Sequence, residues 1–182
     1  MKTLKDFIKE SQEINEGLLG DIVRKLLDTG LSWIEGSVKW IANKSTEAVG
    51  EIWKTHRDVL TTAYSDFRRT YPQYKFLPET VKTPEEYTVG DIGIFFDDRI
   101  SADAKINYAN DLITKIKKRK GSKPGDVEYY IAQKTALCYV GIIKNPKATA
   151  ADKTNADKFL NTIISTNNDE VKELIEEKIK EF

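Results

Sequence analysis

Apolar residues recur at helical spacing along most of this chain, and this pattern constrains the fold more than any other feature of the sequence. Leu18, Ile22 and Leu26 lie four residues apart, and a three-to-four-residue period returns between residues 101 and 182. Because about 3.6 residues make one helical turn, this spacing places the apolar side chains on one face of each helix. The pattern predicts a mainly α protein with a helical domain of five to seven helices.

The helical pattern stops in the middle of the chain. Pro72, Pro78 and Pro84 exclude one long helix there, and tyrosines and phenylalanines gather between them. The following stretch, YTVGDIGIFFDD, alternates β-branched or aromatic residues with smaller ones and contains a Gly-Asp turn signal. We therefore expect residues 71–85 to form an extended connection and residues 87–96 to form a small β-hairpin or strand pair.

Four regions follow from these patterns. We expect residues 1–16 to form a separate docking peptide, 17–70 an amphipathic helical region, 71–100 the connection with short strands, and 101–182 a second helical region. With 182 residues in the chain, residues 17–182 are long enough to bury one core, and we expect one domain.

Helix-capping residues mark the starts of two helices in the last region. Ser101 is a suitable N-cap for a helix that ends before the sequence GSKPG, and Asp126 for the very apolar helix that ends before Pro146. Cys138 lies inside that apolar helix, so we expect it to be buried as a small hydrophobic residue.

Charge and hydropathy exclude several classes of protein. Lysine plus arginine and aspartate plus glutamate both number 29, so the chain has no overall attraction to nucleic acid or to anionic membranes. No apolar run approaches the roughly 18 residues of a membrane span, and acidic residues interrupt the start of the chain where a secretory signal would be apolar. We expect a soluble protein with no membrane partner.

Candidate catalytic groups are few. The single histidine, His56, lies on a predicted helix as a surface or cap residue, without a neighbouring histidine or cysteine to complete a zinc site. Asp97 and Asp98 follow the predicted strand, but consecutive strand residues point to opposite faces, which favours loop and capping roles. An enzyme would need Asp97, Asp98 and His56 to converge. We expect a non-enzymatic protein without metal or cofactor.

The strongest charge feature is the sequence TKIKKRKGSKPG. It carries six positive charges with no acidic residue between Asp111 and Asp126. Cations complement the dipole at a helix C-terminus, which explains part of the run. The remainder predicts a non-specific contact with DNA phosphates or with an acidic protein surface. The residues concerned are Lys115, Lys117, Lys118, Arg119, Lys120 and Lys123.

The opening sequence, MKTLKDFIKE, is amphipathic and short. Leu4, Phe7 and Ile8 share one helical face and charged residues fill the other, but an isolated helix of this length is marginal in water. We expect this segment to become ordered when it docks on a partner. Its face suits an address label that is recognised by a helical scaffold.

The same ten residues resemble the capsid-targeting peptide of the internal head proteins of T-even-like tailed phages. That peptide begins with Met-Lys-Thr, continues with an apolar and two polar residues, and ends in Phe-Ile-x-Glu, which corresponds here to Phe7, Ile8 and Glu10. The resemblance implies delivery into the assembling prohead, with the prohead scaffold or other virion proteins as partners. It covers only the first 10 to 17 residues.

The resemblance also implies processing by the head maturation protease, which cuts after glutamate in Leu/Ile-x-Glu. One such triplet ends at Glu10, and a second runs from Ile14 to Glu16, just before Gly17. Ile175-Glu176-Glu177 has the same pattern, so the triplet alone carries little weight. We expect a virion protein of the capsid interior, made in the host cytoplasm. One of two hypotheses is that it is packaged cargo, injected with the DNA. The other is an uncleaved structural component of the capsid, neck or tail.

Overall fold

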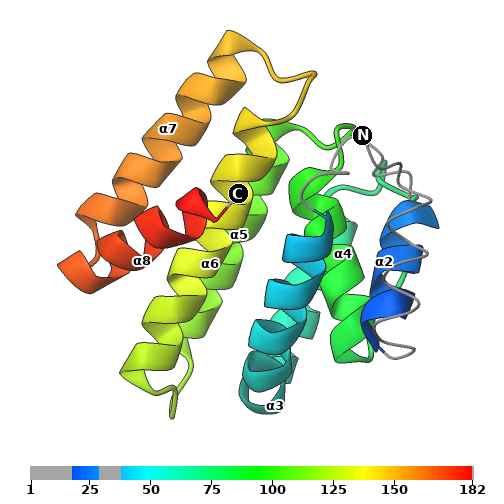
Figure 1. Cartoon of the computed structure of the whole chain (residues 1–182), viewed down its shortest axis with the longest axis horizontal. Coiled ribbons are helices and arrows are strands. Elements are labelled where there is room, and N and C mark those ends of the chain that lie inside the picture. The colour runs from blue at the N-terminus through cyan, green and yellow to red at the C-terminus, as the bar shows by residue number, and fades with distance from the viewer. Residues whose placement is uncertain (1–17, 29–37, 182) are drawn as a thin grey trace.

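The structure is a computed structural model that describes residues 18–28 and 38–181. These ranges hold seven helices and no strand (Figure 1). The helices are α2 (Leu18–Asp28), α3 (Val38–Thr70), α4 (Pro84–Phe96), α5 (Ala102–Lys118), α6 (Pro124–Ile143), α7 (Ala150–Ser165) and α8 (Asp169–Lys180). The expectation of a mainly α protein is confirmed.

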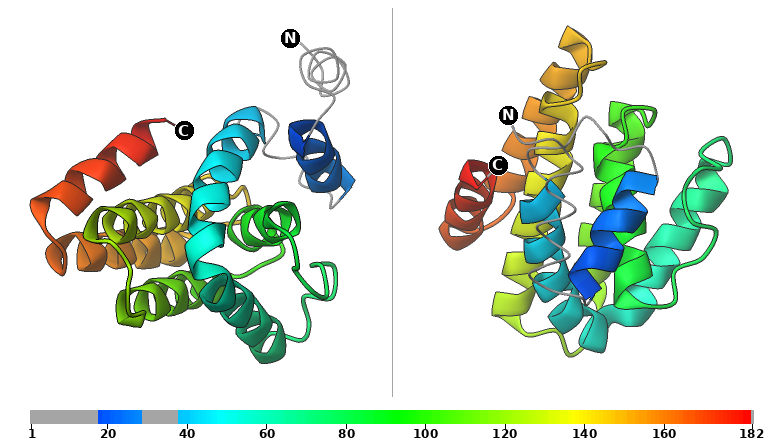
Figure 2. Two further views of the ribbon diagram at one scale, coloured as in Figure 1. Left: turned by 90° about the horizontal axis from the view of Figure 1, so that it is seen from below. Right: turned by 45° about the vertical axis from the view of Figure 1, so that its right-hand side comes forward.

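Helix α6 is the centre of the bundle. It packs against α4, α5, α7 and α8, while α3 packs against α2, α4 and α5. Figure 1 shows α8 and α2 on opposite sides of the molecule, and Figure 2 shows the same bundle from below and from the side. The central position of α6 explains its composition, because a helix that is covered on most sides has no need of a polar face.

The expected β-hairpin at residues 87–96 is wrong, because these residues belong to helix α4. The helix begins with clear signals: the Thr83 hydroxyl accepts a hydrogen bond from the Glu86 N–H at 3.2 Å, and Pro84 occupies the first turn. Every residue from Tyr87 to Phe96 is buried. A helix buried all round shows no helical period, so its β-branched and aromatic residues resembled a strand.

Residues 71–83 connect α3 to α4 without helix or strand and are fastened to α3 by hydrogen bonds. The Tyr64 hydroxyl donates to the Pro78 carbonyl at 2.7 Å. Arg68 donates to the carbonyls of Tyr74 at 2.8 Å and Leu77 at 3.1 Å, and the side chains of Tyr74 and Leu77 are buried. This connection is thus an ordered part of the core.

Of the two predicted N-caps in the second half of the chain, one is confirmed and one is wrong. Ser101 caps α5, where its hydroxyl accepts from the Ala104 N–H at 3.3 Å. Asp126 does not cap α6: the helix begins at Pro124, the N-cap position is Lys123, and no side chain caps it. Proline is favoured in the first helical turn because its missing N–H is not needed there, and this preference outweighed the aspartate signal.

Candidate functional site

The basic run occupies one end of the hairpin formed by α5 and α6. Helix α5 ends at Lys118, and Arg119 is its C-cap residue. Gly121 then adopts a positive φ of 85°, which only glycine reaches easily, and the chain turns into α6 at Pro124. The six cations therefore lie together at the turn, as their sequence spacing suggested.

Two of the six cations bind α3 and α5 rather than facing solvent freely. Lys115 forms ion pairs with Asp66, at 3.2 Å, and with Asp111, and Arg119 pairs with Asp58. Burial opposes the charge of Lys115, but its hydrogen bonds to Asp111 and Asp66 outweigh this and raise its pKa. The hydrogen bond from Arg119 lowers the pKa of Asp58. These pairs hold the end of α5 against α3.

The other four cations are exposed, and none forms an ion pair with a described residue. We call them the basic loop: Lys117, Lys118, Lys120 and Lys123. Four exposed ammonium groups within one turn are suited to contact phosphates or carboxylates without base-specific recognition. Of the six residues predicted to contact DNA or an acidic surface, these four are the exposed ones.

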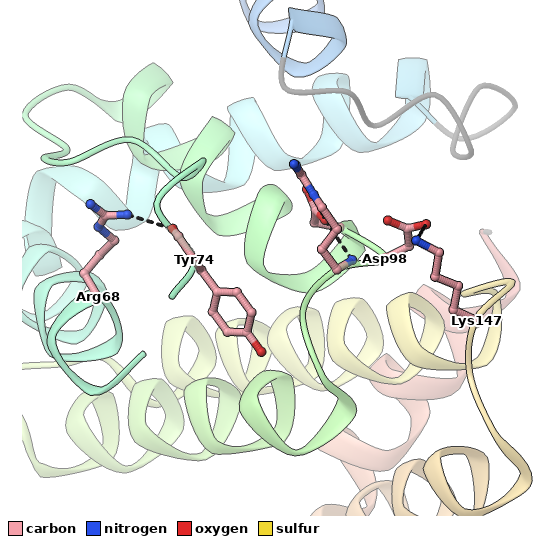
Figure 3. Close-up of polar contacts among 6 residues, drawn as sticks. Arg68, Tyr74, Asp98 and Lys147 are labelled. Atoms are coloured by element: carbon pink, nitrogen blue, oxygen red, sulfur yellow. Dashed lines mark hydrogen bonds and ion pairs between the residues drawn. The ribbon is translucent and has the colours of Figure 1, made fainter. Parts of the chain in front are cut away.

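Asp97 and Asp98 have separate partners. Asp97 is buried at the end of α4, where it accepts hydrogen bonds from the Arg99 backbone N–H at 2.9 Å and from two guanidinium nitrogens at 2.9 and 2.6 Å. Asp98 pairs with Lys147 at 2.8 Å, and Figure 3 shows these two side chains pointing toward one another. The two carboxylates are engaged in ion pairs at a turn, which agrees with the expected loop role, but neither caps α5, whose N-cap is Ser101.

Arg68 and Tyr74 are the other labelled pair in Figure 3. The guanidinium of Arg68 reaches the backbone carbonyl of Tyr74, while the phenol of Tyr74 extends away toward α5. There its hydroxyl accepts a hydrogen bond from the Ser101 N–H at 3.1 Å. These contacts place the turn that carries Asp97 and Asp98 against the 71–83 connection, so its geometry is fixed by structural bonds.

His56 and Cys138 are both buried. For Cys138 this confirms the expectation, and burial raises the pKa of its thiol. For His56 the expected surface or cap position is wrong, since only 2 % of the residue is exposed. It lies where the backbone of α3 departs from helical geometry, with φ −124° and ψ 15°. Among the described residues, no group of three or more histidines, cysteines or carboxylates has a geometry that would hold a metal ion.

The structure also contains a buried charge cluster that the sequence patterns did not single out. Asp91 of α4 accepts hydrogen bonds from the hydroxyls of Tyr87, at 3.0 Å, and Tyr108, at 2.9 Å, and forms an ion pair with Lys134 of α6. Burial, and next the charge of Asp91, raise the pKa of both tyrosines. The available signal was the one acidic residue of the apolar stretch 87–96 and the one lysine of helix α6.

The residues for which the sequence analysis predicts targeting and cleavage roles lie outside the described ranges. These are Leu4, Phe7, Ile8, Glu10, Ile14, Glu16 and Gly17. No described helix combines the length and the apolar composition needed to cross a bilayer. Comparison of the chain with protein-family models, with curated proteins and with solved structures found no match in any of the three.

Proposed function

We propose that this chain is a non-enzymatic phage virion protein, directed to the prohead by its N-terminal peptide and trimmed there by the maturation protease. The observation that carries the proposal is the opening sequence, in which Met-Lys-Thr and Phe-Ile-x-Glu occur at the spacing of the targeting peptide. The second cleavage triplet ends at Glu16, and α2 begins two residues later at Leu18. Cleavage after Glu16 would leave α2 whole.

The position of the third Ile-x-Glu triplet is compatible with selective trimming. Ile175, Glu176 and Glu177 lie inside α8, and Ile175 is completely buried against the core. Proteases act on segments that are exposed and extended, so a triplet within a packed helix is a poor substrate. We therefore propose that trimming is confined to the sites at Glu10 and Glu16.

The basic loop gives a reason for the protein to travel with packaged DNA. Lys117, Lys118, Lys120 and Lys123 are exposed, and phosphate contacts of this kind are independent of base sequence. A protein enclosed with DNA and injected with it would need such weak, non-specific contacts. An acidic protein surface is the alternative partner for the same four side chains.

The second candidate is an uncleaved structural component of the capsid, neck or tail that binds its neighbours through its N-terminal helices. The amphipathic face of Leu4, Phe7 and Ile8 favours it, because such a face also serves for permanent docking. Copy number separates the two candidates. A structural component is present at a fixed number per particle, whereas the amount of cargo follows its expression level.

A reporter fusion tests the targeting role. Residues 1–16 are fused to a soluble fluorescent protein and expressed during infection, and purified particles are assayed for fluorescence. We expect packaging of the fusion and none of a matched peptide in which Phe7 and Ile8 are changed to serine. Equal fluorescence in particles with both peptides, or none with either, would contradict targeting by this segment.

A further inference from the structure

A cavity of about 510 Å³ lies beside the basic loop, between α3 and the start of α6. Its size falls within the range of small-molecule sites in proteins. Ile52 and Tyr129 supply its apolar and aromatic lining, and most of the other lining residues are polar. The lining residues are Glu51, Ile52, Thr55, His56, Gly121, Lys123, Asp126 and Tyr129.

His56 is the first sign that the cavity is a binding site. The residue is 2 % exposed, and its Nδ1 atom has no hydrogen-bond partner among the described residues. A buried polar atom without a partner destabilises the fold by about 1–3 kcal/mol, and among the four such atoms of the described residues only that of His56 belongs to a residue that lines this cavity. Burial, and next the positive charge of Arg119, lower the pKa of His56. The neutral imidazole that results offers one donor and one acceptor.

The start of α6 is the second sign. Its N-cap residue, Lys123, makes no side-chain cap, so the first-turn N–H groups of this 20-residue helix receive no side-chain acceptor. The positive end of the helix dipole lies beside Lys123, which is the N-cap residue of α6 and lines the cavity. This edge of the cavity is suited to a phosphate group.

The acidic residues of the cavity exclude a simple anion as the ligand. Asp126 has no ion-pair partner among the described residues, and Glu51 contacts only the exposed Lys54, at 3.4 Å. A bare phosphate would be repelled by these two carboxylates. The ligand must therefore join an anionic group to a part that donates N–H bonds. Ile52 and Tyr129 provide the apolar and aromatic surface against which a flat ring packs.

We propose that this cavity binds a nucleotide, with the base between Ile52 and Tyr129 and the phosphate at Lys123 and the start of α6. Guanine fits best, because its N1–H and N2–H groups are adjacent donors that a carboxylate accepts together, and Asp126 provides that carboxylate. His56 then donates to, or accepts from, the remaining polar edge of the base. The inference does not depend on the virion role, since it rests only on the cavity.

Calorimetric titration of the full chain with GMP, AMP, CMP, UMP and inorganic phosphate tests the proposal. We expect GMP to bind at least tenfold more tightly than the other nucleotides, and phosphate alone not to bind measurably. Asp126→Asn should weaken GMP binding at least tenfold. The matched control is Asp103→Asn, which removes an exposed aspartate from the first turn of α5, at the opposite end of that helix from the turn that lines the cavity, and should bind GMP normally.

His56 provides an independent readout, because it is the only histidine of the chain and its ring protons give a single set of NMR signals. These signals should shift with GMP and stay unchanged with phosphate. A 5′-phosphorylated single-stranded oligoguanylate is then compared with GMP. Tighter binding of the oligonucleotide would identify the end of a nucleic-acid strand as the natural ligand, and equal binding of the two would identify a free nucleotide. The proposal is overturned by absence of GMP binding, by equal binding of all four nucleotides, or by full binding in Asp126→Asn.

Discussion

Lys134 of α6 and Asp91 of α4 form an ion pair in the interior, where the two side chains are 1 % and 2 % exposed. The Nζ atom of Lys134 also lies 5.4 Å from the ring centres of both Tyr87 and Tyr130. The pair links the two most buried helices across an apolar core. Because each charge is compensated mainly by the other, neither is tolerated alone.

Replacement of Lys134 by methionine should therefore destabilise the protein strongly. The variant keeps the length of the side chain but leaves the carboxylate of Asp91 buried without its cation. We expect a loss of about 3–5 kcal/mol in the free energy of unfolding, measured by urea denaturation. The control is Lys82→Met, which changes an exposed lysine before α4 and should alter stability little. A Lys134→Met protein as stable as the parent would show that the pair does not hold α4 to α6.

Lys105 predicts an unusual dependence of stability on pH. It is completely buried, forms no ion pair with a described residue, and donates only to the Gly141 carbonyl at 3.4 Å. Desolvation lowers its pKa to about 8, whereas in the unfolded chain the pKa is about 10.4. At pH values between these two pKa values, the unfolded chain binds more protons than the folded chain does. Stability should thus rise with pH, by up to about 1.4 kcal/mol per pH unit for this one group.

Above about pH 10 the buried tyrosines reverse the trend. Burial raises the pKa of Tyr87, Tyr108 and Tyr130, so the folded protein keeps protons that the unfolded chain loses, and stability falls as pH rises. Urea midpoints measured across this range should pass through a maximum in the parent. In Lys105→Met the rise should disappear while the alkaline fall remains. Parallel profiles for the two proteins would contradict the assignment to Lys105.

Two glycines in helices should respond to alanine in opposite directions. A Cβ atom at Gly141 would overlap the carbonyl oxygen of Phe95, where α6 approaches the end of α4, and backbone cannot move aside easily. Gly141→Ala should destabilise by about 1–3 kcal/mol or more. Gly50, in α3, has no atom within 4 Å of the added carbon. Gly50→Ala should stabilise by up to about 1 kcal/mol, and the same sign for both variants in thermal melts would refute this packing.

Replacement of the basic loop tests the proposed DNA contact. Glutamine at Lys117, Lys118, Lys120 and Lys123 should abolish measurable binding to duplex DNA at low salt. The parent should show a slope of log affinity against log salt of about −3 to −4, as four phosphate contacts require. The control set has the same loss of charge at exposed positions of α7 and α8: Lys153, Lys158, Lys172 and Lys180. Equal loss in both sets would mean that net charge, and not the loop, sets the affinity.

Asp98→Asn tests the enzyme alternative. Asp98 is paired only with the largely exposed Lys147, so the variant should fold as the parent does. Asp97 is a poorer choice, because it is buried and accepts three hydrogen bonds from Arg99. We expect no change in infectivity or DNA binding with Asp98→Asn. A specific loss of either, with stability unchanged, would point to chemistry at this turn.

The sequence patterns predicted those elements whose signals are local. The period of Leu18, Ile22 and Leu26 and the cap at Ser101 identified helices because one face of each meets solvent or because a side chain bonds the first turn. Helix α4 was missed because burial on all sides removes the period. The basic loop was found from charge alone, but the pairing of Lys115 and Arg119 with α3 depends on contacts between distant residues. The ion pair of Asp91 with Lys134 could not be predicted for the same reason, since the two residues are distant in the sequence.

The cavity at His56 shows the same limit. Its lining comes from α3, the turn after α5 and the start of α6, so no stretch of sequence contains it. The local pattern around His56 is that of an ordinary amphipathic helix. The departure from helical geometry at His56, which places the imidazole in the interior, has no proline or glycine signal at that residue. Only the folded arrangement of these three segments reveals it.

The intact mass and N-terminal sequence of this protein, recovered from mature particles, test the proposed function most directly. We predict a chain that begins at Gly17, or at Ser11 if only the first site is cut, with the triplet in α8 intact. A chain that still begins at Met1 would contradict trimming and favour the uncleaved structural component. Absence of the protein from particles would contradict a virion role altogether.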